Sequence, residues 1–174
     1  MVLDTGISPH HPDLKPNIKQ VLNFTSSRSP YDRDGHGTFC SGLVAGIDNG
    51  KGIIGVAPRA RIISGKVLDD DGYGYDAWIA RGLRWAIANK KRYGIEIVSL
   101  SLGGESYEPI LKRAFIAARK AIDLAMYTLS VNYLNQALIQ AYERGISLRI
   151  ILAQREARKN YAITSQLLQA GIPA

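Results

Sequence analysis

The sequence predicts an α/β fold, a three-layer α/β/α sandwich with about six mainly parallel strands. Apolar, β-branched runs alternate with segments of helical period along the chain. Glycines mark the ends of many of these segments. The 174 residues are 46% hydrophobic and 21% charged, which is the composition of a globular domain rather than a disordered or fibrous chain. We therefore expect a single domain over residues 1–174.

Six runs rich in Ile, Val and Leu are expected to form the strands. They lie at residues 1–3, 18–24, 62–67, 95–100, 122–127 and 148–152. The first run ends in a short Asp-Thr-Gly turn, and the fourth follows Gly94. The last two runs are separated by about twenty residues, enough for a helical crossover between parallel strands.

Five segments carry apolar residues at helical spacing. They lie at residues 37–47, 76–93, 108–120, 131–144 and 162–170. The clearest is the second, in which Ile79, Leu83 and Ala86 form one stripe. The last one stops at Gly171, a residue suited to a left-handed C-cap.

Two short motifs in the first third of the chain carry candidate chemistry. Asp4 ends the first apolar run, so it lies at the carboxyl edge of a parallel sheet, where α/β proteins place their functional groups. His36 lies between two glycines at the start of the first helical segment. Taken singly, Asp4 is also suited to capping a turn, and His36 to binding helix-terminal groups.

Together these motifs closely resemble the aspartate and histidine motifs of subtilisin-like serine peptidases, in the same order. The likeness continues through Gly55-Val56-Ala57-Pro58, Lys66-Val67-Leu68, Trp85-Ala86-Ile87-Ala88 and Ser99-Leu100-Ser101-Leu102-Gly103-Gly104, and covers residues 1–118. It implies the strand order 2-3-1-4-5-6. It also implies that Asp4 orients His36 as general base, and that Ser101, Leu102 and Gly103 bind an extended peptide substrate.

Two further features follow from the resemblance. Cys40, the one cysteine, matches a subgroup with a thiol after the histidine, although the reading as a small buried apolar residue is favoured. The loop at residues 47–53 resembles the family's calcium loop, helped by a separate aspartate. The candidate ligands are Asp13, Ile47, Asn49, Lys51 and Ile53. A turn without metal is an equally good interpretation, because the family's N-terminal ligand segment is not in this sequence. No other cofactor is expected.

The family's serine and oxyanion motifs, Gly-Thr-Ser-Met-Ala and Ala-Gly-Asn, do not occur in the sequence. Thr164-Ser165 matches only two residues of the first motif, and its neighbours differ, so Ser165 is not expected to act as nucleophile. Asp4 and His36 are therefore expected to be a vestigial pair, and the chain is expected to be inactive as an enzyme.

Residues 119–174 resemble the opening βαβ unit of phospholipase D-like proteins. Residues 121–127, Arg144-Gly145-Ile146-Ser147-Leu148-Arg149 and residues 166–173 carry this likeness. That family's His-x-Lys motif is not in this sequence. The favoured interpretation is an engineered or selected chimeric α/β scaffold without native catalysis. The alternatives are a residual subtilisin-like peptidase and a weak nucleic-acid or phosphate binder.

Charge and termini give the remaining expectations. The net charge of +7 is spread along the chain without a long basic run, which argues against a specific nucleic-acid partner. No apolar run is long enough to span a membrane, and Met1 leads into Val2-Leu3-Asp4 without a signal peptide. The localisation is unknown, since subtilases are usually secreted but this chain has no signal peptide, which is compatible with recombinant production in cytoplasm. A homo-oligomer is expected, because no strand follows residues 148–152 to cover that edge.

Overall fold

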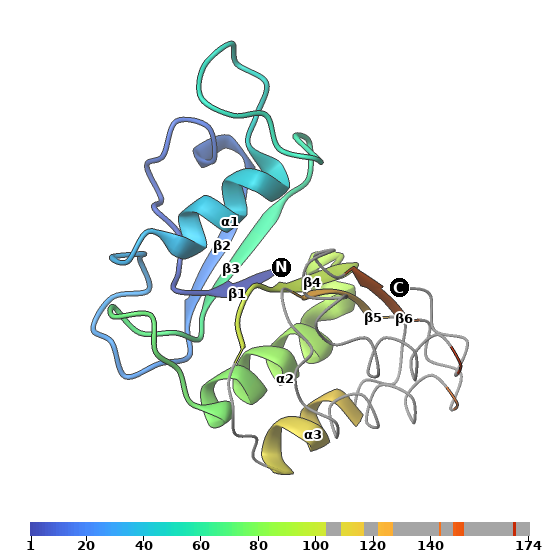
Figure 1. Cartoon of the computed structure of the whole chain (residues 1–174). Coiled ribbons are helices and arrows are strands. Elements are labelled where there is room, and N and C mark those ends of the chain that lie inside the picture. Colours follow the sequence, from blue (N-terminus) through green and yellow to red (C-terminus); the bar gives the residue numbers. More distant parts are fainter. Residues whose placement is uncertain (104–108, 117–121, 127–142, 144–147, 152–168, 170–174) are drawn as a thin grey trace. The chain divides into compact units, whose positions relative to one another are not determined.

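We describe the protein from a computed structural model, in which residues 1–103, 109–116, 122–126, 143, 148–151 and 169 are described (Figure 1). The chain divides into two compact units, Met1–Gly82 and Leu83–Ala174. The boundary lies within a helix and not at the junction near residue 118 that the sequence suggests. The expectation of one domain stays a prediction.

The first unit contains three parallel strands and their helices. The strands are β1 (Val2–Asp4), β2 (Ile18–Asn23) and β3 (Ile62–Lys66), in the order β2-β3-β1. A 3-10 turn, η1 (Lys15–Asn17), precedes β2. Asp4 of β1 and Asn23 of β2 both pair with Lys66 of β3, so all three strands end at the same level. Their carboxyl ends form the edge at which functional groups are expected.

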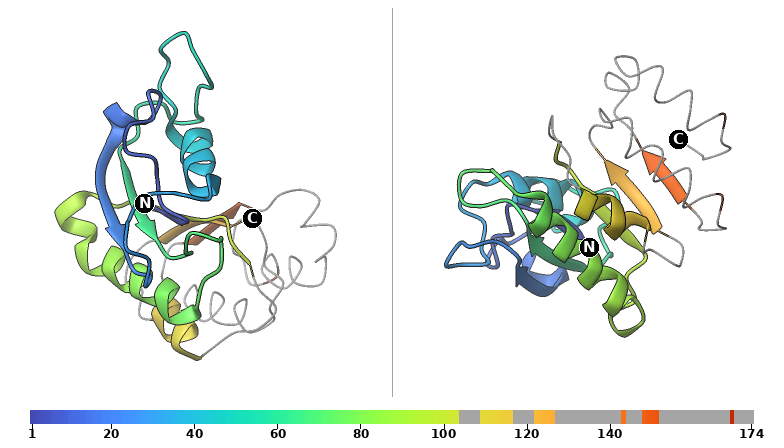
Figure 2. Two further views of the ribbon diagram at one scale, coloured as in Figure 1. Left: turned by 90° about the vertical axis from the view of Figure 1, so that its left-hand side faces the viewer. Right: turned by 90° about the horizontal axis from the view of Figure 1, so that it is seen from below.

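The first helix of this unit, α1 (His36–Ala45), lies along one face of its strands (Figures 1 and 2). The buried cluster between them combines strand, loop and helix residues: Val2, Ile7, Leu14, Ala45 and Ile62. Leu3 points to the opposite face, because side chains alternate along a strand. There it meets Gly82 in the helix α2 (Asp76–Tyr93), where an added Cβ would lie 2.9 Å from Leu3.

Helix α2 has the signals of a stable helix at both ends. Asp76 lies in its first turn, and basic residues fill its last turn, which suits the helix dipole. Gly94 follows with φ +63°, a left-handed conformation that ends the helix. Ile79, Leu83 and Ala86 are buried, which confirms the stripe expected from the sequence.

The second unit contains β4 (Ile97–Leu100), α3 (Pro109–Ile116), β5 (Ile122–Met126) and β6 (Leu148–Ile151). Its strands are parallel and ordered β4-β5-β6, with β5 and β6 side by side in Figure 2. The strand orders of the two units are those of the two halves of the predicted 2-3-1-4-5-6 arrangement. The α/β fold with parallel strands is therefore confirmed. The expected helices at 131–144 and 162–170 lie almost wholly outside the described residues.

Candidate active site

The carboxyl end of β1 and the amino end of α1 bring together the two residues predicted to form a catalytic pair. Asp4 is the last residue of β1 and is 1% exposed, whereas the His36 side chain, at the first position of α1, is 46% exposed. Their Oδ1 and Nδ1 atoms are 2.8 Å apart, a hydrogen-bonding distance. The buried carboxylate holds one ring nitrogen and leaves Nε2 as the nitrogen that can exchange a proton with a second group.

The electrostatics of the pair favour the protonated imidazole. The hydrogen bond to Asp4 raises the pKa of His36 above its ordinary value of 6.5, and partial burial opposes this rise. The negative charges of Asp4, Asp34 and Asp32 raise it further. This charge interaction stabilises the folded protein fully below the unfolded-state pKa of histidine, and the contribution is lost as the pH rises through the higher folded-state value.

A hydrogen-bond network ties the start of α1 to the end of β1. The Asp32 carboxylate accepts bonds from the Gly35 N–H (2.9 Å), the Thr38 N–H (2.8 Å) and the Thr38 hydroxyl (2.5 Å). It also accepts a bond from the Thr5 hydroxyl at 2.8 Å, and that hydroxyl oxygen accepts the Gly37 N–H at 2.8 Å. Burial acts to raise the pKa of Asp32, but the bonds from Thr38, Gly35 and Thr5 outweigh it and lower the pKa.

Two glycines allow the backbones of these elements to approach closely. A Cβ on Gly37 would lie 2.2 Å from the Gly6 carbonyl oxygen, a distance that real side chains do not reach. Gly6 itself has φ +113°, which favours glycine, and its added Cβ would lie 2.7 Å from the Pro30 carbonyl oxygen. These close backbone contacts hold the turn after β1 against the first turn of α1, the two segments that carry Asp4 and His36.

A buried lysine supports the same strand end. Lys66 is fully buried, its Nζ donates to the Thr5 carbonyl oxygen at 2.5 Å, and it lies 3.1 Å from Asp70 Oδ1. Buried ammonium groups need such partners because desolvation is costly. Lys66 therefore fixes the backbone immediately after Asp4.

Sequence reasoning missed the supporting roles of Thr5, Asp32, Thr38 and Lys66. Asp32 carries no local capping signal in the sequence, because Gly35 is the N-cap of α1 and Asp32 lies three residues before it. The role of Lys66 carries no such local signal, because its partners come from distant positions in the chain.

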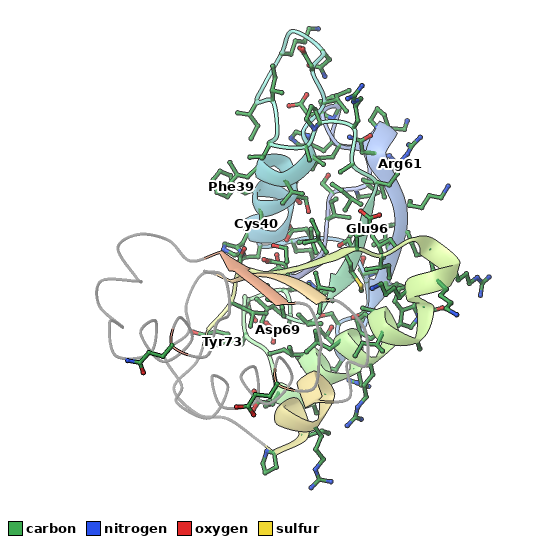
Figure 3. All side chains as sticks on the ribbon, turned by 90° about the vertical axis from the view of Figure 1, so that its right-hand side faces the viewer. Phe39, Cys40, Arg61, Asp69, Tyr73 and Glu96 are labelled. Carbon is green, nitrogen blue, oxygen red and sulfur yellow. The ribbon has the colours of Figure 1, made fainter. Side chains whose placement is uncertain are left out.

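Cys40 lies one helical turn after His36 on α1 and is labelled in Figure 3. Its residue is 8% exposed, which agrees with the small buried residue expected from the sequence. The Sγ atom is 3.8 Å from both ring nitrogens of His36. The thiol is thus in direct contact with the His36 imidazole.

The comparisons with known proteins agree with this geometry. A family model described as the subtilase family matches residues 1–138. The chain belongs to the subtilase family. It is 40% identical over 113 residues to subtilisin E of Bacillus subtilis strain 168, a match that covers 64% of this chain and 28% of that relative. It is 41% identical over 118 residues to an intracellular serine protease of Paenibacillus polymyxa, which covers 65% of this chain and 35% of that relative.

A solved structure of sphericase is similar with a TM-score of 0.62 and 34% identity, over 71% of this chain and 44% of that one. The chain thus spans about a third of the length of the curated relatives named above. The family match continues to residue 138, past the junction expected near residue 118, so the phospholipase D-like assignment gains no support. One relative is named as intracellular, and the localisation of this chain stays open.

The predicted substrate-binding residues Ser101, Leu102 and Gly103 follow β4 directly, in the second unit. Asp4 and His36 belong to the first unit, so the peptide-binding role of these three residues stays a prediction. Ser165 lies outside the described residues.

The loop predicted to bind calcium brings two of its candidate ligands together. Asp13 is 4% exposed, and its Oδ1 accepts a bond from the Asn49 side-chain amide at 3.0 Å. The Asn49 Oδ1 accepts the Lys51 N–H at 3.0 Å, so this oxygen is already bonded within the loop. The Asp13 carbonyl oxygen accepts the Ile47 N–H, and Ile53 is 44% exposed. The residues fit a calcium ion only in part, and calcium binding stays a prediction.

Among the described residues, no helix combines the length and the apolar character needed to cross a membrane.

Proposed function

We propose that this chain carries the general-base half of a subtilisin-like serine peptidase site, with His36 as base and Asp4 as the group that orients it. The observation that carries the proposal is the 2.8 Å contact between the buried Asp4 carboxylate and Nδ1 of a half-exposed His36. A carboxylate at Nδ1 favours the tautomer whose Nε2 lone pair is open to accept a proton.

In this chemistry His36 takes the proton of an attacking hydroxyl on Nε2 and becomes an imidazolium. The Asp4 carboxylate stabilises the positive charge that forms, and its burial strengthens the interaction. Thr5, Asp32 and Lys66 act as positioning residues, because they hold the strand end and the helix start without touching the ring in any described contact.

We further propose that the chain by itself does not turn over peptides. The sequence holds neither the family's serine motif nor its oxyanion asparagine motif. Loss of the nucleophile alone removes on the order of 10⁶ in rate in such enzymes. General-base assistance without a nucleophile contributes about 10²–10⁴ at most.

The test combines three readouts on the whole chain. We expect hydrolysis of an activated ester, p-nitrophenyl acetate, above the buffer rate, with loss of this excess in His36→Ala. His10→Ala is the matched control, because His10 is an exposed histidine outside the site, and it should keep the wild-type rate. A chromogenic peptide should not be cleaved, and a fluorophosphonate probe should not label the protein.

Two results would overturn the proposal. Equal ester rates in wild type and His36→Ala would show that His36 is not a functional base. Stoichiometric fluorophosphonate labelling of a serine, with peptide turnover that His36→Ala abolishes, would show that the chain contains a nucleophile.

The scaffold interpretation is a separate proposal that rests on the sequence of residues 119–174 alone. In it, a phospholipase D-like fragment extends the subtilase sheet beyond about residue 118, as one engineered or selected domain. Amide hydrogen exchange tests the single-domain part, because cooperative protection must then extend across both units. Independent opening of the two units would contradict it.

A further inference from the structure

Three side chains around the catalytic pair carry ligand atoms typical of transition-metal sites. One oxygen of Asp4, one nitrogen of His36 and the Cys40 sulfur all lie within 4.8 Å of one another. His36 and Cys40 are four positions apart on α1, a spacing that places two ligands on the same helix face. The third ligand comes from the neighbouring strand β1.

Asp4 has a second carboxylate oxygen that the catalytic pair does not use. Oδ1 contacts His36 Nδ1 at 2.8 Å and accepts the Thr5 N–H at 2.7 Å. Oδ2 is buried and has no hydrogen-bond partner among the residues that the structure describes. A buried carboxylate oxygen without a partner is costly, and a cation would satisfy it.

We propose that Asp4, His36 and Cys40 form a binding site for a thiophilic divalent cation, of which Zn²⁺ is the best fit. Zinc binds Cys, His and carboxylate groups at about 2.0–2.3 Å, which places tetrahedral ligand atoms roughly 3.3–3.7 Å apart. The sulfur is 3.8 Å from each ring nitrogen, and the carboxylate is 2.8 Å from Nδ1. The Asp4 oxygen and the Cys40 sulfur lie within 4.8 Å of each other, so these two ligands move closer together when they share an ion. The half-exposed His36 side chain leaves solvent access for a water as fourth ligand.

The donor set selects against the hard cation expected at the calcium loop. A thiolate and an imidazole bind zinc-like ions strongly, whereas calcium requires six or more oxygens. The charges also fit, because the Asp4 carboxylate and the Cys40 thiolate neutralise the ion, and Asp32 and Asp34 add negative charge nearby.

An ion bound at this site would prevent His36 from acting as a general base. An ion bound to Nδ1, the nitrogen that faces Asp4, leaves the ring proton on Nε2, so Nε2 can no longer accept a proton. This regulatory consequence rests on the proposed function of His36, whereas the metal site itself does not.

The experiment uses Co²⁺ as a spectroscopic probe for the zinc site. Because Cys40 is the chain's one cysteine, a sulfur-to-cobalt charge-transfer band in the near ultraviolet reports on this residue alone. We expect the band to saturate at one Co²⁺ per chain and to disappear when Zn²⁺ is added in equal amount. Cys40→Ser and Cys40→Ala should lack the band, and Asp4→Asn should weaken Co²⁺ binding by at least about tenfold.

The controls separate a lost ligand from a lost fold. His10→Ala should bind Co²⁺ as tightly as wild type, and circular dichroism without metal should be the same for each variant as for wild type. Either of two results overturns the metal site: no charge-transfer band in the wild type, or Zn²⁺ affinity by calorimetry that is unchanged in both Cys40 variants. A metal site that forms while the ester assay shows no His36-dependent rate would refute the proposed function alone.

Discussion

Removing the Asp32 carboxylate should loosen the start of α1 and thereby the position of His36. Asp32 accepts four hydrogen bonds, from Gly35, from Thr5 and twice from Thr38. In Asp32→Ala the donors lose their acceptor, and the helix loses the negative charge that favours its amino end. We expect a less stable first unit with the same overall secondary structure.

The size of the effect follows from the number and exposure of these bonds. A hydrogen bond to a charged group contributes about 1.5–3 kcal/mol, and a negative charge near a helix amino end about 0.3–1 kcal/mol. The four bonds share two oxygens on a partly exposed carboxylate, so they do not add fully. We therefore expect Asp32→Ala to lower the free energy of unfolding by about 2–4 kcal/mol. Asp71→Ala, at an exposed carboxylate in a loop, should change it by less than about 0.5 kcal/mol.

The pH dependence gives an independent check on the same residue. The folded-state pKa of Asp32 is lowered, so its contribution is present above the unfolded-state value near 3.8 and is lost as the pH falls through the folded-state value. The stability difference between wild type and Asp32→Asn should therefore be larger at neutral pH than in acid. Urea titrations followed by circular dichroism at both pH values measure it.

Equal stability of wild type and Asp32→Ala at neutral pH would refute the network as a stabilising element. A difference between wild type and Asp32→Asn that does not change with pH would show that the negative charge of Asp32 makes no contribution.

Three other predictions test neighbouring features. Gly37→Ala should lower the free energy of unfolding by about 2–3 kcal/mol, because the new Cβ would lie 2.2 Å from the Gly6 carbonyl oxygen. Gly50→Ala should lower it by about 1 kcal/mol, because its Cβ has no atom within 4 Å and only the positive φ is unfavourable. Urea titration measures both changes. Millimolar calcium should raise the melting temperature by less than about 2 °C, and a larger rise that Asn49→Ala abolishes would contradict this. Sedimentation should show a homo-oligomer, because Phe39, Ile54 and Val56 are 60%, 60% and 95% exposed, and a clean monomer at high concentration would refute it.

The sequence predicted the elements of the first unit well because their signals are local. The strand ending at Asp4 and the helix beginning near His36 both depend on short-range turn and capping chemistry, and the stop of α2 at Gly94 in the second unit has the same origin. The pairing of Asp4 with His36 came from the family resemblance. The 2.8 Å separation is a tertiary distance that periodicity does not encode.

The contacts that support the pair were not predictable in the same way. Thr5 bonds to Asp32 across 27 residues, and Lys66 bonds to Thr5 across 61 residues. Such partners are fixed by the register of the strands and by the close approach of Gly37 to Gly6. A sequence read segment by segment contains no signal for these long-range contacts.

The most direct test of the base pair is an NMR titration of the His36 imidazole in wild type and Asp4→Asn, with His36→Ala used to assign the resonance. We predict that the pKa of His36 lies above 6.5 in the wild type and falls when the Asp4 carboxylate becomes an amide, because the hydrogen bond to Asp4 is the first cause of the shift. A His36 pKa at or below 6.5 in the wild type, or one that does not change in Asp4→Asn, would contradict the account.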